Sequence, residues 1–458
     1  MNFINTTNHP ALAFEGIDQL GQSFHVVVMR QTYTWNEQGL LILAEEQDPL
    51  RLQDQLVDTK DLMSGVVEES DLAHYKPKCD VIIKGHAYAP KHKLNQDSFT
   101  ASIKLQSPDY MVLGEPVAAT KYAFVDQSTK KPPKEQYQVG QVLIDKTLTI
   151  LSPRYLLNDS ITGNLHYKLH IEPMPSKVSL NPSSSFGGYS LIEDNHKALK
   201  YIDKNELIPE DQRSAIKLNP HHGVIAYLQE DSFNPAGTGY CSPIYYKYVQ
   251  PPRITLSQVH HPDLLINESL VNQVAKDKLD RDTHNRLVAG FGVRAKSHPE
   301  RSKLMGTVDD VFIKSETVVP KDFDFAMWNS AYADQQTPFL LGNEWLTLTN
   351  LCKSDTLAAN ILKSGDTQLK LYLPEVLAYL SLESNHPEMI DTELPMKLDS
   401  VIVSTDTQKV NLVWRSMIIS DYLPKEATLK MLDPDEQSKL SEQYYTQTIK
   451  TARPYDNH

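Results

Sequence analysis

The stretch Ser23-Phe-His-Val-Val-Val-Met-Arg-Gln-Thr-Tyr-Thr-Trp35 is rich in β-branched and aromatic residues, and Gly39-Leu-Leu-Ile-Leu-Ala44 follows it after the polar turn Asn36-Glu-Gln. Two such runs on either side of a short polar turn predict a β-hairpin. A hairpin near the amino terminus is therefore the first element that we expect.

Further strands are indicated by alternation of apolar and polar residues. Phe99, Ala101, Ile103 and Leu105 alternate with polar side chains, and residues 142–151 and 165–171 repeat this pattern. A period of two predicts strands with one buried face. Residues 400–404 and 410–415 predict a second hairpin, over Asp406-Thr-Gln-Lys409. We expect a mainly β, or β-dominated α+β, fold with antiparallel, sandwich-like sheets and a few short helices.

The middle of the chain differs from both ends. Residues 192–218 fit one or two short surface helices, and the proline-rich residues 219–262 predict an ordered, loop-dominated connector. A polar, amphipathic stretch at 433–451 predicts a terminal helix. The expected units are an N-terminal antiparallel β unit at 1–175, a loop-rich middle region at 176–350 and a C-terminal β unit at 351–458.

Composition excludes several classes of protein. The chain has 458 residues, with 58 Asp and Glu against 45 Lys and Arg, and its formal net charge is −13. This balance argues against a nucleic-acid partner, which requires a basic surface. The three cysteines are widely spaced, and no apolar run approaches the ~18 residues of a membrane span. We therefore expect a cytoplasmic protein without membrane insertion. Acids are in excess in residues 1–80, which suggests either a solvated acidic face or a docking surface for a basic partner.

Catalytic motifs are missing from the sequence. It contains no GxSxG, HExxH or GxxxxGK[ST] string and no EF-hand loop, so we expect neither enzyme activity nor a cofactor. One alternative stays open, a metal-assisted hydrolase that would use the region of Asp80, His86 and His92. A polar cluster is expected from Asp334-Gln335-Gln336 with Glu344, near Trp328 and Trp345, and we expect it to be a structural hydrogen-bond network rather than a catalytic group.

Several short strings then occur in a characteristic order. The first are Asp48-Pro-Leu50, Glu69-Ser-Asp-Leu72, Lys76-Pro-Lys-Cys-Asp-Val81 and Gly85-His-Ala-Tyr-Ala-Pro90. They resemble the amino-terminal signature of a bacterial domain-of-unknown-function family, number two-one-six-nine, which is encoded beside type VI secretion spike genes. The likeness spans roughly residues 20 to 416 and continues through Phe186-Gly-Gly188, Asn234-Pro-Ala-Gly-Thr-Gly-Tyr240, Ala289-Gly-Phe-Gly292, Gly306-Thr-Val-Asp309, Pro320-Lys-Asp-Phe-Asp324, Asn329, Asp334-Gln335, Gly342-Asn-Glu344 and Trp414-Arg415.

The resemblance implies a cytoplasmic adaptor or chaperone that binds and stabilises a toxic effector protein. Such a protein helps to load its effector onto the trimeric spike protein or the PAAR-type tip. A structural component of the secreted particle is a further alternative. The sequence departs from the family at Ser183-Ser-Ser185 and in the lysine-rich residues 193–218, which leaves open which effector is bound.

The motif residues also have a physical interpretation. The glycines and prolines would fix turns, and Asp71, Asp80, Asp324, Asp334, Glu344 and Arg415 would tie those turns by charge-assisted hydrogen bonds. The expected scaffold and partner-binding residues are Gly85, His86, Tyr88, Pro90, Phe186, Gly187, Gly188, Asn234, Pro235, Gly237, Asp324, Asp334, Gln335, Glu344, Trp414 and Arg415.

Overall fold

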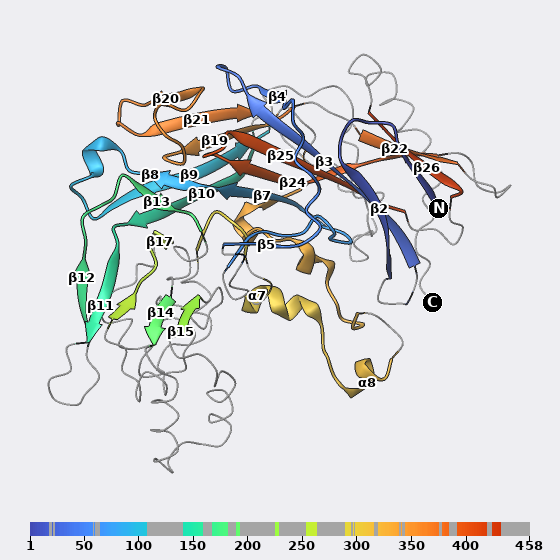
Figure 1. Ribbon diagram of the computed structural model, residues 1–458, viewed down its shortest axis with the longest axis horizontal. Coiled ribbons are helices and arrows are strands. Elements are labelled where there is room, and N and C mark those ends of the chain that lie inside the picture. The colour runs from blue at the N-terminus through green and yellow to red at the C-terminus, as the bar shows by residue number, and fades with distance from the viewer. Residues whose placement is uncertain are drawn as a thin grey trace, which may run out of the picture.

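The structure is a computed structural model built mainly from β-strands (Figure 1). It describes residues 1–17, 21, 23–57, 59, 65–107, 141–158, 167–181, 189–192, 225–228, 253–262, 289–294, 296, 298–315, 319–338, 340, 344–374, 378–383, 392–418 and 424–431. The expected strand-dominated fold with several antiparallel sheets and few short helices is confirmed.

A seven-stranded sheet forms the centre of the molecule. Its strands follow the order β18-β7-β24-β25-β3-β2, with β4 paired to β3. Their bounds are β2 Ala11–Ile17, β3 Ser23–Trp35, β4 Leu41–Leu43, β7 Cys79–Lys84, β18 Gln336–Thr337, β24 Lys397–Ser404 and β25 Lys409–Ile418. Both expected hairpins are present, as β3 with β4 and as β24 with β25.

Both faces of this sheet are buried. On β3, Val27 and Met29 join the main core, whereas Val26 and Val28 pack on the opposite side against residues such as Phe325 and Val293. A strand covered on both faces reads as a continuous apolar run instead of an alternating one. This explains the uninterrupted sequence Val26-Val-Val-Met29.

A six-stranded sheet and a four-stranded sheet contribute to the main core. The first has the order β17-β10-β9-β19-β21-β20, and the second the order β1-β26-β22-β23. Their bounds are β9 Ser98–Gln106, β10 Val142–Leu151, β17 Val259–His260, β19 Trp345–Thr349, β20 Ala359–Ile361, β21 Thr367–Tyr372, β1 Asn2–Asn5, β22 Ala378–Glu383, β23 Thr392–Pro395 and β26 Glu426–Met431.

Among the strands that the structure describes, two pairs are parallel, in addition to the antiparallel pairs that we expected. β7 runs parallel to β24, and β1 runs parallel to β26. Strands from residues 1–175 therefore pair with strands beyond residue 351 in the same sheets. The boundaries near 175 and 350 stay predictions.

The remaining elements are short. Small sheets are formed by β5 Gln55–Leu56 with β6 Val66–Glu68, by β8 His86–Tyr88 with β13 Lys177–Ser179, by β11 Arg154–Asn158 with β12 Tyr167–Ile171 and β16 Arg253–Thr255, and by β14 Tyr189–Ile192 with β15 Ile225–Leu228. The helices among the described residues are η1 Lys91–Lys93, α7 Pro299–Ser302, η3 Lys303–Met305, α8 Asp310–Ile313, η4 Phe325–Trp328 and η5 Ala333–Gln335.

The expectations for the middle and end of the chain concern residues that the structure describes only in part. Within 219–262, expected to be a loop-dominated connector, residues 225–228 and 253–262 are described and include the short strands β15, β16 and β17. The helices expected at 192–218 and 433–451 lie outside the described residues, except for Ile192, which ends β14. Within the described residues, no helix has the length and apolar character needed to cross a membrane.

Candidate functional site

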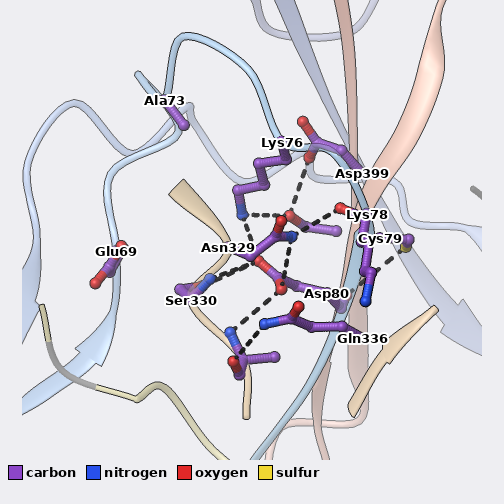
Figure 2. Close-up of polar contacts among 12 residues, drawn as sticks. Glu69, Ala73, Lys76, Lys78, Cys79, Asp80, Asn329, Ser330, Gln336 and Asp399 are labelled. Carbon is purple, nitrogen blue, oxygen red and sulfur yellow. Dashed lines mark hydrogen bonds and ion pairs between the residues drawn. The ribbon is translucent and has the colours of Figure 1, made fainter. Parts of the chain in front are cut away.

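The buried carboxylate of Asp80, on β7, is the centre of a polar network (Figure 2). Its oxygens accept hydrogen bonds from the Nζ of Lys76 at 2.9 Å and the Nδ2 of Asn329 at 3.0 Å. The backbone N–H groups of Ser330 and Ala331 donate at 2.8 and 3.3 Å. The carboxylate thus holds the loop after η4 against the central sheet.

The same network extends across the sheet to β24 and β25. Lys76 also donates to the hydroxyl of Ser400 at 2.8 Å, and Ser400 donates to Asp399 at 3.0 Å. Arg415 pairs with Asp399 and donates to the carbonyls of Asp71 and Ala73 at 2.8 and 2.6 Å. Burial alone would lower the pKa of Lys76, but Asp80 and Asp399 outweigh it and raise that pKa.

A second buried network surrounds Arg30, in the middle of β3. Its guanidinium pairs with Glu68 at 2.6 Å and with Asp71 at 3.0 Å, and Lys84 also pairs with Glu68. Burial would raise the pKa of Glu68, but the two cations outweigh it and lower that pKa. These pairs attach the segment before β7 to the face of the central sheet.

Arg301, on α7, forms a third buried link. Two of its nitrogens bind the two carboxylate oxygens of Glu69 at 2.6 and 2.7 Å. The same side chain donates to the carbonyls of Arg294 and Met327, at 2.6 and 2.8 Å. Arg301 therefore joins α7, the segment at 66–72 and the end of η4.

Asp334 and Gln335 meet Lys146 of β10. The Lys146 amine donates to Asp334 at 2.8 Å and to Gln335 at 2.7 Å, and it lies 4.3 Å from the ring centroid of Tyr332. Burial lowers the pKa of Lys146 to about 8, although Asp334 acts in the opposite direction. Gln335 also donates to the carbonyls of Val81 and Phe291, both at 2.8 Å. These bonds are contacts of a structural network.

Gly85, His86 and Tyr88 lie against the turn between β24 and β25. Gly85 has φ +130°, and a Cβ atom there would lie 2.6 Å from the hydroxyl of Thr405. Asp406, on this turn, contacts the Nδ1 of His86 at 2.6 Å and accepts from the hydroxyl of Tyr88 at 2.7 Å. Gly85 separates β7 from β8 and lets this turn approach closely.

The remaining predicted residues have separate roles. Asp324 caps η4 by accepting from the N–H of Ala326 at 2.8 Å. Pro90 is buried and precedes η1, Trp414 packs in the main core, and Glu344 is buried beside β19. The structure therefore does not gather the predicted residues into one pocket. Phe186, Gly187, Gly188, Asn234, Pro235 and Gly237 lie outside the described residues.

The acids of residues 1–80 serve mainly as internal counter-charges. Paired carboxylates belong to Asp48, Asp54, Glu68, Glu69, Asp71 and Asp80, and their cations include Lys409 and Lys296. Glu15, Glu37, Glu45 and Glu46 are exposed, and Asp18, Asp58 and Asp61 lie outside the described residues. Six of the ten described acids in this stretch are thus paired with cations of the fold.

The three residues considered for a metal-assisted hydrolase contact different parts of the fold. Asp80 is held in the buried network, His86 contacts Asp406, and His92 lies next to Gly365. No group of three or more His, Cys, Asp or Glu side chains within the described residues could hold a metal ion. A cavity of ≈ 20 Å³ beside Ile83, Gly85 and Tyr332 has room for about one water molecule.

Sequence reasoning missed Arg30, Lys146 and Arg301, which supply three of the buried cations. One signal for Arg30 was available. It follows Val26-Val-Val-Met29 directly, and a cation in a strand buried on both faces requires carboxylate partners. Lys146 carried a similar signal, because it is in phase with Ile144, Leu148 and Ile150 on the expected buried face of residues 142–151. Arg301 stands in polar sequence surroundings that carry no comparable signal.

The fold and these networks define a β-rich protein whose buried charges are used to fasten loops to a central sheet. A family model described as "Uncharacterized protein conserved in bacteria (DUF2169)" matches residues 20–415. The chain belongs to this family. No curated protein and no solved structure matches it.

Proposed function

We propose that the protein is a cytoplasmic adaptor or chaperone of the type VI secretion system. It binds and stabilises a toxic effector, and it helps to load that effector onto the trimeric spike protein or the PAAR-type tip. The sequence motifs of the family motivate the choice of secretion system. A binding role is supported by the internal use of the motif carboxylates, since Asp80 already accepts from a lysine, an amide and backbone N–H groups.

The observation that carries the proposal is an ordered arm with an apolar tip. The arm consists of residues 306–315 and 319–322, and it carries α8 away from the sheets (Figure 1). Val311 and Ile313 on α8, together with Val308 in the segment that leads to it, are 71%, 68% and 63% exposed. Branched apolar side chains that gather on a projecting element are typical of a surface that another protein covers.

The base of the arm is fixed by specific contacts. Gly306 has φ +78°, and the backbone N–H of Thr307 donates to both carboxylate oxygens of Asp322, at 2.9 and 3.1 Å. Asp309 caps α8 by accepting from the N–H groups of Val311 and Phe312. A preformed contact element loses little conformational entropy when a partner binds. We assign the tip to an apolar segment of the effector.

Co-expression with the effector encoded beside its gene tests the proposal. We expect the protein to co-purify with the effector, to lengthen its half-life in the cell and to be required for its secretion. The double variant Val308→Ser, Val311→Ser should fold normally and lose the effector. Ile361→Ser is the matched control, because Ile361 is 66% exposed on β20 and lies outside the arm.

Two outcomes would contradict the proposal. One is an effector that is equally stable and equally secreted when this protein is deleted. The other is recovery of this protein in the secreted fraction in the same amount as the spike protein. The second result would identify a structural component of the particle.

A further inference from the structure

β2 ends the series β7, β24, β25, β3, β2, and within the described part of the chain no strand pairs with its outer edge (Figure 1). Its seven residues, Ala11–Ile17, pair with β3 alone among the described strands. The strand contains no proline and no lysine, which are the residues that commonly protect a sheet edge. An unprotected edge of this length is a template for another strand.

The register of the β2–β3 pair defines which backbone groups face outward. The N–H of Arg30 donates to the carbonyl of Pro10, so the even-numbered residues of β2 exchange hydrogen bonds with β3. The N–H and C=O groups of Ala11, Ala13, Glu15 and Ile17 consequently point away from the sheet. No residue in the described part of the chain supplies a hydrogen-bond partner for them.

We propose that this edge pairs with β2 of a second copy of the chain, antiparallel and about a two-fold axis at Phe14. In this register Ala11 lies opposite Ile17 of the second copy, and Ala13 lies opposite Glu15. All of the outward-facing groups are then satisfied in hydrogen-bonded pairs. The two seven-stranded sheets become one continuous sheet.

The side chains of β2 complement themselves in the same register. Leu12, which is 37% exposed, lies opposite Gly16 of the second copy. Gly16 has no side chain, and the ring of Phe24 occupies that space: a Cβ on Gly16 would lie 2.4 Å from the Cζ of Phe24. Leu12 therefore lies over Gly16 of the second copy, next to the buried side chain of Phe24. Phe14 meets Phe14 at the two-fold axis, where cross-strand aromatic pairs are favourable.

Neighbouring pairing registers of the two β2 strands are less favourable. Moving the axis to Glu15 places two carboxylates directly opposite each other, and like charges in that position are destabilising. The side chain of Glu15 is 75% exposed, so it remains in solvent and opposite an alanine when the axis passes through Phe14. Moving the axis to Ala13 leaves the outward-facing groups of Ile17 without a partner.

The molar mass of the full chain in solution is the first test. Light scattering across a concentration series should show a dimer. Leu12→Lys should weaken the dimer by at least about tenfold, because the lysine would be buried without a carboxylate partner. Ile361→Lys, a substitution of an exposed residue on the edge strand β20, should leave the dimer unchanged.

Disulfide cross-linking is the second test and reports the register. Under mild oxidation a mixture of the Ala13→Cys and Glu15→Cys chains should yield a covalent dimer, because the two positions face each other. A mixture of Glu15→Cys with Ile361→Cys should give only the background of the unsubstituted chain. Cys79 and Cys352 are buried and add little to that background.

A chain that is monomeric at every concentration, and whose Ala13→Cys and Glu15→Cys variants do not cross-link to each other, would overturn the proposal. If Leu12→Lys then abolished co-purification of the effector, the edge would be assigned to a strand of the effector instead. A dimer that survives Leu12→Lys and cross-links through other positions would equally overturn it.

Discussion

The guanidinium of Arg301 and the carboxylate of Glu69 face each other through two parallel hydrogen bonds, at 2.6 and 2.7 Å. The Arg301 side chain is fully buried, and the Glu69 side chain is 9% exposed. A bidentate pair of this kind fixes the relative orientation of the two side chains, in addition to the electrostatic attraction between them. It fastens α7 to the segment that leads into β7.

Arg301→Met should lower the free energy of unfolding by about 3 kcal/mol, because it leaves a nearly buried carboxylate without its cation. Chemical denaturation measures this loss. Lys303→Ala is the control, since Lys303 pairs with Glu300 in solvent and the pair should contribute less than about 0.5 kcal/mol. Equal losses in the two variants would contradict the assigned role of Arg301.

Gly85→Ala should destabilise the protein by about 1–3 kcal/mol, because a residue with a side chain is strained at φ +130° and its Cβ would collide with Thr405. Gly292→Ala is a matched control. A Cβ on Gly292 would approach only two backbone oxygens, at 3.9 Å, and its φ is ordinary. Thermal unfolding of both variants measures the difference. A loss in Gly292→Ala as large as that in Gly85→Ala would refute the steric argument.

Lys76→Met and Asp80→Asn should each lower the free energy of unfolding by about 3 kcal/mol, because either substitution leaves the other charge buried without its main partner. The loss in the double variant should be smaller than the sum of the two single losses by about 1–3 kcal/mol, since neither charge remains. A double-mutant cycle from urea denaturation measures this coupling. Additive losses would mean that the two side chains act independently.

Acid should destabilise the protein partly through His260. Burial lowers the pKa of this histidine to about 4, and its Nε2 contacts the hydroxyl and carbonyl of Ser257 at 2.6 and 3.0 Å. The unfolded state, with a pKa near 6.5, binds a proton first, so stability is lost as the pH falls from about 6.5 to about 4.

His260→Gln should be less stable at neutral pH and show a shallower loss over that interval, as measured by denaturation at a series of pH values. His261→Gln, at the exposed neighbouring position, should keep the slope of the unsubstituted chain. An unchanged slope in His260→Gln would show that other groups account for the acid sensitivity. His298, whose pKa burial also lowers to about 4, is the next candidate.

Local patterns predicted the strands that depend on local contacts. The hairpins at 23–44 and 400–415 follow from β-branched runs around short turns, and the alternation at 98–105 predicts the buried face of β9. The parallel pairing of β7 with β24 was not predictable, because Asp80 and Ser400 are far apart in the sequence. No spacing rule connects strands over such a distance.

The candidate site was predicted in part for the same reason. Asp71, Asp80 and Arg415 were expected to tie the turns of the motif glycines and prolines, and the structure shows each of them hydrogen-bonded to backbone groups of other connecting segments. Their partners could not be inferred, because they are selected by sheet register and by the path of residues 289–337. Asp80 and His86 were grouped for their closeness in sequence. Gly85 separates them by ending β7, and the two side chains contact different parts of the fold.

The use of amino-terminal acids as internal counter-charges has a consequence for how the chain acquires its structure during synthesis. Asp48 and Glu69 are matched by Lys409 and Arg301, and β3 lies between β2 and β25. When residues 1–100 leave the ribosome, these carboxylates have no cation and β3 lacks one of its neighbours. The amino-terminal strands therefore cannot complete the central sheet until Ile418 has been translated. Until then they are accessible to proteases and to other nascent chains.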